Sequence, residues 1–259
     1  MSISGCAGKE QRVAPPAAIP LARAVAVVND NIAAVGGTLR AVGWVDGSFV
    51  DADGHLRSYN VDAVLFYLEP GHVRFDLKSF GTRRFLFGSN GSRYWFYDQS
   101  RDVYQCGRHD AEDELSADMP IKPRQLVDAL GLSFMSDRDA ADGTAVRMVQ
   151  RVGDQYQQVL FMVSDGLSRP LIEKEYWLDR FPPRLVRRVV FRNGNGEVEL
   201  ESQLDDYRAI EPGGATLPSV MVANWPESMA HMRFRVGKWA VFGQVGPDSP
   251  QFETPAECE

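Results

Sequence analysis

The sequence predicts a mainly β, α+β protein in which one curved antiparallel sheet carries an N-terminal helix and an inserted helix over its concave face. Three observations predict it: apolar and polar residues alternate in many segments, turn-forming residues follow these segments closely, and two stretches have helical spacing instead. No linker-like stretch interrupts residues 38–238. We therefore expect a single domain over residues 21–243, between a flexible tether at residues 1–20 and a disordered tail at residues 244–259.

The two helical stretches differ in position and length. The first begins at Leu21 and ends at Gly36-Gly37, a pair that commonly terminates helices. Its apolar positions follow three- and four-residue spacing: Leu21, Val25, Val28, Ile32 and Val35. The second, Pro120–Leu132, has a proline near its start, as the first turn of a helix tolerates. It is expected to separate two blocks of strands.

The strands are predicted from alternation with a period of two, which gives a strand one apolar and one solvated face. The clearest examples are Val73–Lys78, Glu197–Leu204 and His231–Val236. Turn signals separate neighbouring strands at Asp53-Gly54, Pro70-Gly71, Asn90-Gly91, Asp165-Gly166 and Asn193–Gly196. Such short turns join antiparallel neighbours, so the sheet is expected to be a meander.

Composition excludes several classes of partner. The formal net charge is −7 and no run of Lys or Arg occurs, which argues against binding to nucleic acid or to an anionic membrane surface. No window approaches the roughly 18 consecutive apolar residues that a transmembrane helix requires. Any attachment to a membrane is therefore expected to be an anchor or a surface contact.

The N-terminal sequence Ile3-Ser4-Gly5-Cys6 resembles a bacterial lipobox, in which the cysteine is acylated. The polar, Ala- and Pro-rich residues 7–20 that follow are typical of a flexible tether. The basic start and apolar segment of a secretory signal are missing before Cys6. Two interpretations remain: the start lies within a longer signal peptide, or the match is chance and Cys6 is a free thiol at a frayed terminus.

Residues that carry catalytic or metal chemistry are scattered. No second metal ligand lies at a suitable spacing from any of the four histidines, His55, His72, His109 and His231. No nucleophile elbow and no phosphate-binding loop is present. A Cys106–Cys258 disulfide is possible in an oxidising compartment, but residues 244–259 have little to bury, and a mobile tail disfavours the bridge. The sequence thus predicts no metal, no cofactor and no enzymatic activity.

Two stretches resemble a known family. The first is VDAVLFYLEPGHVRFDLKSFGTRRFLFGSNGSRYWFYDQSRDVYQCG, where a strand ending in Pro-Gly precedes "VRFDL" and a turn leads to "YWFYD". The second is EYWLDRFPPRLVRRVVFRNGNGEVELESQLDDYRAI, followed by TLPSVMVAN. Their order is similar to that of the LolA/LolB-like lipoprotein carrier and receptor superfamily of bacterial envelopes, which includes mycobacterial lipid-carrier relatives.

The resemblance implies a half-open β-barrel around an apolar cavity that binds acyl chains of lipids or lipoproteins. It also favours Cys6 as a lipid anchor, and hence a place in the cell envelope, facing the periplasm, with the outer membrane preferred and an envelope protein partner unidentified. The expected cavity lining is aromatic and apolar: Trp44, Phe66, Phe75, Phe85, Phe87, Trp95, Tyr97, Phe161, Met162, Trp177, Phe191 and Phe234. Two alternatives stay open: a structural or interaction lipoprotein with a packed interior, and an enzyme of unrecognised type.

Overall fold

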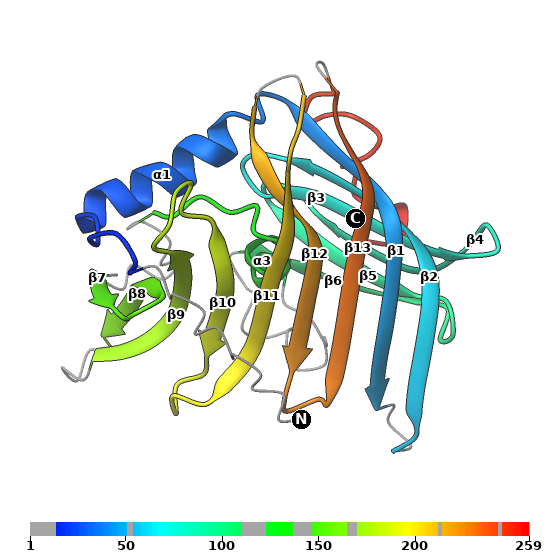
Figure 1. Cartoon of the computed structure of the whole chain (residues 1–259). Coiled ribbons are helices and arrows are strands. Elements are labelled where there is room, and N and C mark those ends of the chain that lie inside the picture. The colour runs from blue at the N-terminus through cyan, green and yellow to red at the C-terminus, as the bar shows by residue number, and fades with distance from the viewer. Residues whose placement is uncertain are drawn as a thin grey trace, which may run out of the picture.

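The structure, a computed structural model, describes residues 14–50, 54–109, 123–136, 147–164, 170–211, 214–242 and 245–258. One antiparallel sheet dominates it and curls around two helices (Figure 1). The helices are α1 (Leu21–Ala33) and α3 (Pro123–Ala129), and a short 3-10 helix, Ala256–Cys258, lies at the C-terminus. The expected order of helix, strands, helix and strands is therefore confirmed.

The sheet contains thirteen strands in the spatial order β6-β5-β4-β3-β2-β1-β13-β12-β11-β10-β9-β8-β7. Because β1 pairs with β13, the two blocks of strands meet at the centre, and β6 and β7 form the two free edges. The strands of the first block are β1 (Thr38–Val50), β2 (Leu56–Leu68), β3 (His72–Ser79), β4 (Thr82–Ser89), β5 (Arg93–Asp98) and β6 (Val103–Arg108). Those of the second are β7 (Arg147–Val152), β8 (Tyr156–Ser164), β9 (Pro170–Asp179), β10 (Val186–Arg192), β11 (Val198–Ala209), β12 (Thr216–Trp225) and β13 (Ala230–Phe242).

The register gives the sheet an apolar inner face and a mixed outer face. One row of directly paired inner residues crosses five strands: Ala41, Leu65, Phe75, Phe87 and Phe96. The neighbouring row on the outer face contains two arginines and a tryptophan: Arg40, Phe66, Arg74, Gly88 and Trp95. Successive side chains of a strand point to opposite faces, so the alternation seen in the sequence becomes a difference between the two faces.

Helix α1 lies across one end of the strands, over the concave side of the sheet (Figure 1). It buries Ala24, Val28 and Ile32, the apolar stripe that its spacing predicts. Two asparagines on α1 also bind backbone groups: Asn31 pairs with both the N–H and the C=O of Thr216, and Asn29 does the same with Met135. These paired hydrogen bonds fix α1 to β12 and to the segment that follows α3.

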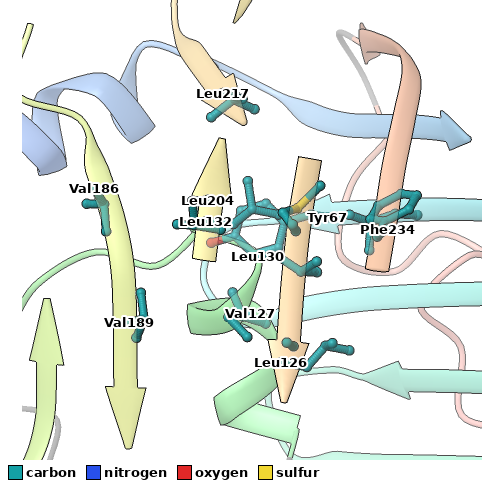
Figure 2. Close-up of a cluster of buried hydrophobic side chains, with 14 of the residues drawn as sticks. Tyr67, Leu126, Val127, Leu130, Leu132, Val186, Val189, Leu204, Leu217 and Phe234 are labelled. Atoms are coloured by element: carbon teal, nitrogen blue, oxygen red, sulfur yellow. The ribbon is translucent and has the colours of Figure 1, made fainter. Parts of the chain in front are cut away.

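Helix α3 fills the interior of the curved sheet. Leu126 and Val127 of α3, and Leu130 and Leu132 directly after it, lie among side chains from strands on both sides of the fold, as Figure 2 shows. The predicted helix at Pro120–Leu132 is thus confirmed in position, although the described helix covers only Pro123–Ala129. Burial of four such side chains is worth about 1.5–3 kcal/mol each. Helix α3 is therefore part of the core.

The C-terminal segment packs on the outer face of β4–β6, so the expectation of a disordered tail is wrong for residues 245–258. Cys258 forms a disulfide with Cys106 on β6, which sequence analysis disfavoured. Cys258 packs with Leu86 and Trp95 in a second, smaller apolar cluster, and Phe252 is only 1% exposed. The tail has something to bury because the outer face of these strands is itself apolar, which the tail's own composition could not indicate.

The N-terminal approach to α1 is also held in place. Gln157 on β8 binds both the N–H and the C=O of Ile19, and Gln150 on β7 donates to the same carbonyl. Arg180 donates to the carbonyl of Pro16. The expected flexible tether over residues 1–20 therefore does not extend to residues 16–19. Residues 1–13, with Cys6, lie outside the described residues.

Candidate functional site

The structure divides the twelve predicted lining residues equally between the two faces. The inner face carries Phe75, Phe85, Phe87, Phe161, Phe191 and Phe234. The outer face carries Trp44, Phe66, Trp95, Tyr97, Met162 and Trp177. The assignment of these last six to the concave side is corrected, because each lies directly next to an inner residue in its strand, and successive side chains point to opposite faces.

Four outer residues illustrate why the sequence misled. Trp95 is buried beneath the C-terminal segment, and Tyr97 packs in the same outer cluster. Arg188 stacks on Trp177 with its guanidinium carbon 4.7 Å from the ring centroid. Trp44 is 41% exposed. A large ring on a strand can thus be buried by the chain terminus, covered by an arginine or left in solvent, and periodicity distinguishes none of these from an inner position.

Most of the inner aromatics are already packed. Phe75, Phe87, Phe161, Phe191 and Phe234 are each at most 8% exposed, in one continuous core with α1 and α3. Phe85 is the exception, since it is only half-buried. A ligand on this inner face would therefore compete with the side chains of α3 for the same space.

Phe85 belongs to a row of half-buried rings on the inner face, and sequence analysis did not include the other members of this row. Phe49 stacks on Tyr59 with centroids 5.2 Å apart, Tyr59 meets Phe85 edge-on at 4.9 Å, and Phe85 faces Phe96 at 6.2 Å. We call Phe49, Tyr59, Phe85 and Phe96 the aromatic row. It begins near the end of β1 that lies farthest from α1 (Figure 1). The pairing of Gly47 with Tyr59 places Tyr59 on the inner face beside the other rings of this row. A single sequence does not reveal which residues of two strands are paired, so the row could not be predicted.

A few polar contacts position α3 against the sheet. Asp128 accepts from the Lys174 ammonium at 3.0 Å and from the Tyr176 hydroxyl, both on β9. Ser202 on β11 donates to the carbonyl of Ala129 at 2.6 Å, close to the C-terminal end of the helix. At the edge of the interior, Gln125 donates to Glu199 at 3.0 Å. These contacts join the seven-residue helix to β9 and β11.

The interior also holds a tyrosine whose ionisation is suppressed. Tyr67 is 3% exposed and donates to Glu69. Burial first, then the hydrogen bond to Glu69 and the negative charges of Glu69 and Asp128, raise the pKa of Tyr67 far above its ordinary value. Tyr67 is therefore a neutral hydrogen-bond donor at any physiological pH, and gives the inner wall no negative charge.

The two best-formed hollows in the described part of the chain are not the large interior cavity that was expected. One, of about 190 Å³, lies between α1 and the start of β10, against Val28, Ile32 and Val186. The other, of about 410 Å³, is an open groove on the outer face of β7–β9, lined by Arg151, Tyr156 and Trp177. The centre of the concave face is filled by α3 and the residues that follow it, whereas the aromatic row is half-buried.

Groups that would serve other functions are sparse in what the structure describes. Within those residues, no set of three or more His, Cys, Asp or Glu side chains is placed to hold a metal ion. Likewise, none of the described helices has both the length and the apolarity needed to cross a membrane. The feature that remains is the apolar inner face with its helix.

The sequence matches no family model and no curated protein. The fold, however, is similar to that of a LolA superfamily protein from Nitrosomonas europaea, with a TM-score of 0.54 and 10% identity over 88% of this chain and 96% of that one. A DUF1329 family protein from Desulfovibrio piger has a TM-score of 0.54, 7% identity and the same two coverages. A domain from Vibrio parahaemolyticus described as an outer membrane lipoprotein-sorting protein has a TM-score of 0.52 and 11% identity over 87% and 94%. The curved antiparallel sheet that encloses α3 is therefore a LolA/LolB-like fold.

Proposed function

We propose that this protein is a non-enzymatic lipoprotein of the bacterial cell envelope that binds acyl chains of lipids or lipoproteins on its concave face. The observation that carries the proposal is the way the apolar inner face is closed. No second sheet covers it within the described residues; α3, seven residues long, does so instead. A short helix can be displaced as a unit, and an acyl chain would then occupy the space of Leu126, Val127 and Leu130.

Two further observations support this proposal. The Cys106–Cys258 disulfide fits an oxidising compartment such as the periplasm, because cytosolic thiols are kept reduced. The similar structures from Nitrosomonas and Vibrio carry names that refer to the LolA superfamily and to lipoprotein sorting. Transport or localisation of lipids or lipoproteins is the role that we infer for this chain from those names and from its own inner face.

The expected binding energy comes from transfer of methylenes out of water. Each buried methylene is worth about 0.8 kcal/mol, so a chain of ten buried methylenes would gain about 8 kcal/mol before the cost of displacing α3. The aromatic row is the proposed entrance, since it is the half-buried part of the aromatic inner surface. Its stiff rings present apolar area without a large loss of side-chain entropy.

Replacing Phe85 with Ala tests both the ligand and the entrance. We expect Phe85→Ala to weaken binding of a fluorescent fatty acid about tenfold, because a large ring in contact with the chain is lost. The matched control is Trp44→Ala, which removes a ring of the outer face and should leave binding unchanged. Lipid extraction of protein purified from its own membrane provides the second readout. Absence of extracted lipid together with no uptake of the fatty acid would refute the binding function.

Anchoring through Cys6 needs a separate test, because Cys6 lies outside the described residues. In a full-length clone expressed in a bacterial host, an azido fatty acid should label the wild type and not Cys6→Ser. Equal labelling of the two proteins, or labelling of neither, would contradict the anchor. The membrane fraction that contains the labelled protein would then distinguish the outer from the inner membrane.

A second function, a structural or interaction lipoprotein without ligand, is favoured by the packed interior. Five inner aromatics are already buried, while Val42 and Trp44 leave apolar surface on the outer face of β1. This alternative predicts that Trp44→Ala abolishes association with an envelope partner and that Phe85→Ala changes nothing. The two functions thus make opposite predictions for the same pair of variants.

A further inference from the structure

Lys174 is the one lysine among the buried polar residues that the structure describes, and it lies in a cage of aromatic rings on the inner face. Its ammonium nitrogen is 4.9 Å from the ring centroid of Phe161, 5.4 Å from that of Tyr176 and 5.7 Å from that of Phe191. Phe161 and Phe191 are the direct cross-strand neighbours of Lys174 on β8 and β10. The three rings, all from strands, attract the cation through their π faces.

The negative charge that completes this site comes from a different element. The Asp128 carboxylate belongs to α3 and uses both oxygens, Oδ2 for Lys174 at 3.0 Å and Oδ1 for the Tyr176 hydroxyl. Lys174 is 8% exposed and Asp128 5%. The aromatic cage is therefore formed by the sheet, whereas the carboxylate that pairs with Lys174 belongs to the helix that covers the sheet.

Displacement of α3 would separate these two parts. The cage would remain on β8–β10, and its two donors, Lys174 and Tyr176, would have lost the carboxylate that now accepts from both of them. A well-packed apolar pair at positions 128 and 174 would close the barrel at least as well as an ion pair does. The presence of an ion pair here, in place of an apolar pair, is explained if Lys174 must bind the oxyanion of a ligand after the helix has moved.

We propose that Lys174 and Tyr176 bind the anionic headgroup of the ligand, and that Asp128 occupies this position in the empty protein. The ligand is then an amphiphile with a long apolar chain and a terminal oxyanion, a carboxylate or a phosphate. Lys174 Nζ and the Tyr176 hydroxyl donate to its oxygens as they now donate to Asp128. This inference rests on the proposed function, because it requires a chain on the inner face.

The test compares ligands of equal chain length and different charge on the full chain. Binding of hexadecanoate, hexadecyl phosphate and hexadecan-1-ol is measured by displacement of a neutral fluorescent lipid. The wild type should prefer the charged ligands over the alcohol by about tenfold, the value of one charge-assisted hydrogen bond. The stronger of the two oxyanions identifies the headgroup class, and acetate and inorganic phosphate show whether the headgroup binds without a chain.

Lys174→Met removes the charge and keeps the length of the side chain, so it should abolish the preference: hexadecanoate and hexadecyl phosphate should bind no more tightly than the alcohol. The control is Lys238→Met, on the exposed outer face of β13, which should retain the preference. Asp128→Asn removes the internal competitor, so hexadecanoate should raise its melting temperature more than that of the wild type. If Lys174→Met fails to fold, Tyr176→Phe removes one donor and should reduce the preference.

The outcomes separate this inference from the function on which it rests. Equal affinity of the wild type for the alcohol and for both anions overturns the headgroup site but leaves acyl binding intact. An equal loss of alcohol and anion binding in Lys174→Met likewise overturns it, since the residue would then be structural. Failure of the wild type to bind any of the three long-chain ligands refutes both.

Discussion

Asp128→Ala is expected to lower the free energy of unfolding by about 3–5 kcal/mol, the usual cost of removing one partner of a buried ion pair. The change leaves the Lys174 ammonium without its carboxylate at 8% exposure, and removes the acceptor of the Tyr176 hydroxyl. The same substitution detaches α3 from β9. Urea denaturation followed by circular dichroism measures the effect directly.

A second variant shows whether the loss belongs to the pair. Asp128→Leu combined with Lys174→Met replaces both charges by apolar groups, and should recover stability to within about 1 kcal/mol of the wild type. The exposed Asp205, which contacts Arg187 at 3.1 Å, provides a control, since Asp205→Ala should change stability by less than about 0.5 kcal/mol. If the double variant is as unstable as Asp128→Ala, the two charges are not coupled.

Cys258→Ser is expected to cost about 2–5 kcal/mol, because the Cys106–Cys258 bridge joins residues separated by 152 positions and limits the unfolded chain. The C-terminal segment should leave the outer face of β4–β6, which exposes Trp95 to water and shifts its fluorescence to longer wavelength. The same change should follow when the wild type is reduced. Denaturation with and without reductant measures the stability, and the emission spectrum measures the release.

Cys6→Ser is the matched control for that experiment, because it removes a cysteine outside the bridge and should not alter stability. Thiol titration of unlipidated, oxidised protein should find one free thiol, since two of the three cysteines are joined. Three free thiols would contradict the bridge. An unchanged emission spectrum in Cys258→Ser would show that Phe252 and its neighbours hold the C-terminal segment without the disulfide.

The fold was predictable because its signals are local. Alternation at Val73–Lys78 and His231–Val236 assigns strands, and the apolar stripe from Leu21 to Val35 assigns α1, without reference to any distant residue. The order of these elements along the chain then restricts the topology to a meander. Family resemblance added the curvature of the sheet, which no short segment encodes.

The faces of individual strands were less predictable because they depend on long-range packing. In Arg93–Asp98 the four central residues are all aromatic, so both faces of this strand carry rings. The two that point inward are Tyr94 and Phe96. Bulges at Val42/Gly43 and Phe161/Met162 shift the alternation by one residue. Lys174 and Asp128 could not have been paired, since they are 46 residues apart and lie on different elements.

The two ends of the chain also have a consequence for the edges of the open sheet. A free edge strand presents unpaired backbone groups and invites association with other chains. Here Gln150 of the β7 edge binds the backbone near Ile19, and Cys106 of the β6 edge is joined to Cys258. The chain therefore places one of its own segments against each edge strand, residues 16–19 at β7 and residues 245–258 at β6. Shortening it at either end, as is common when a protein is prepared for crystallisation, would uncover a strand and favour self-association.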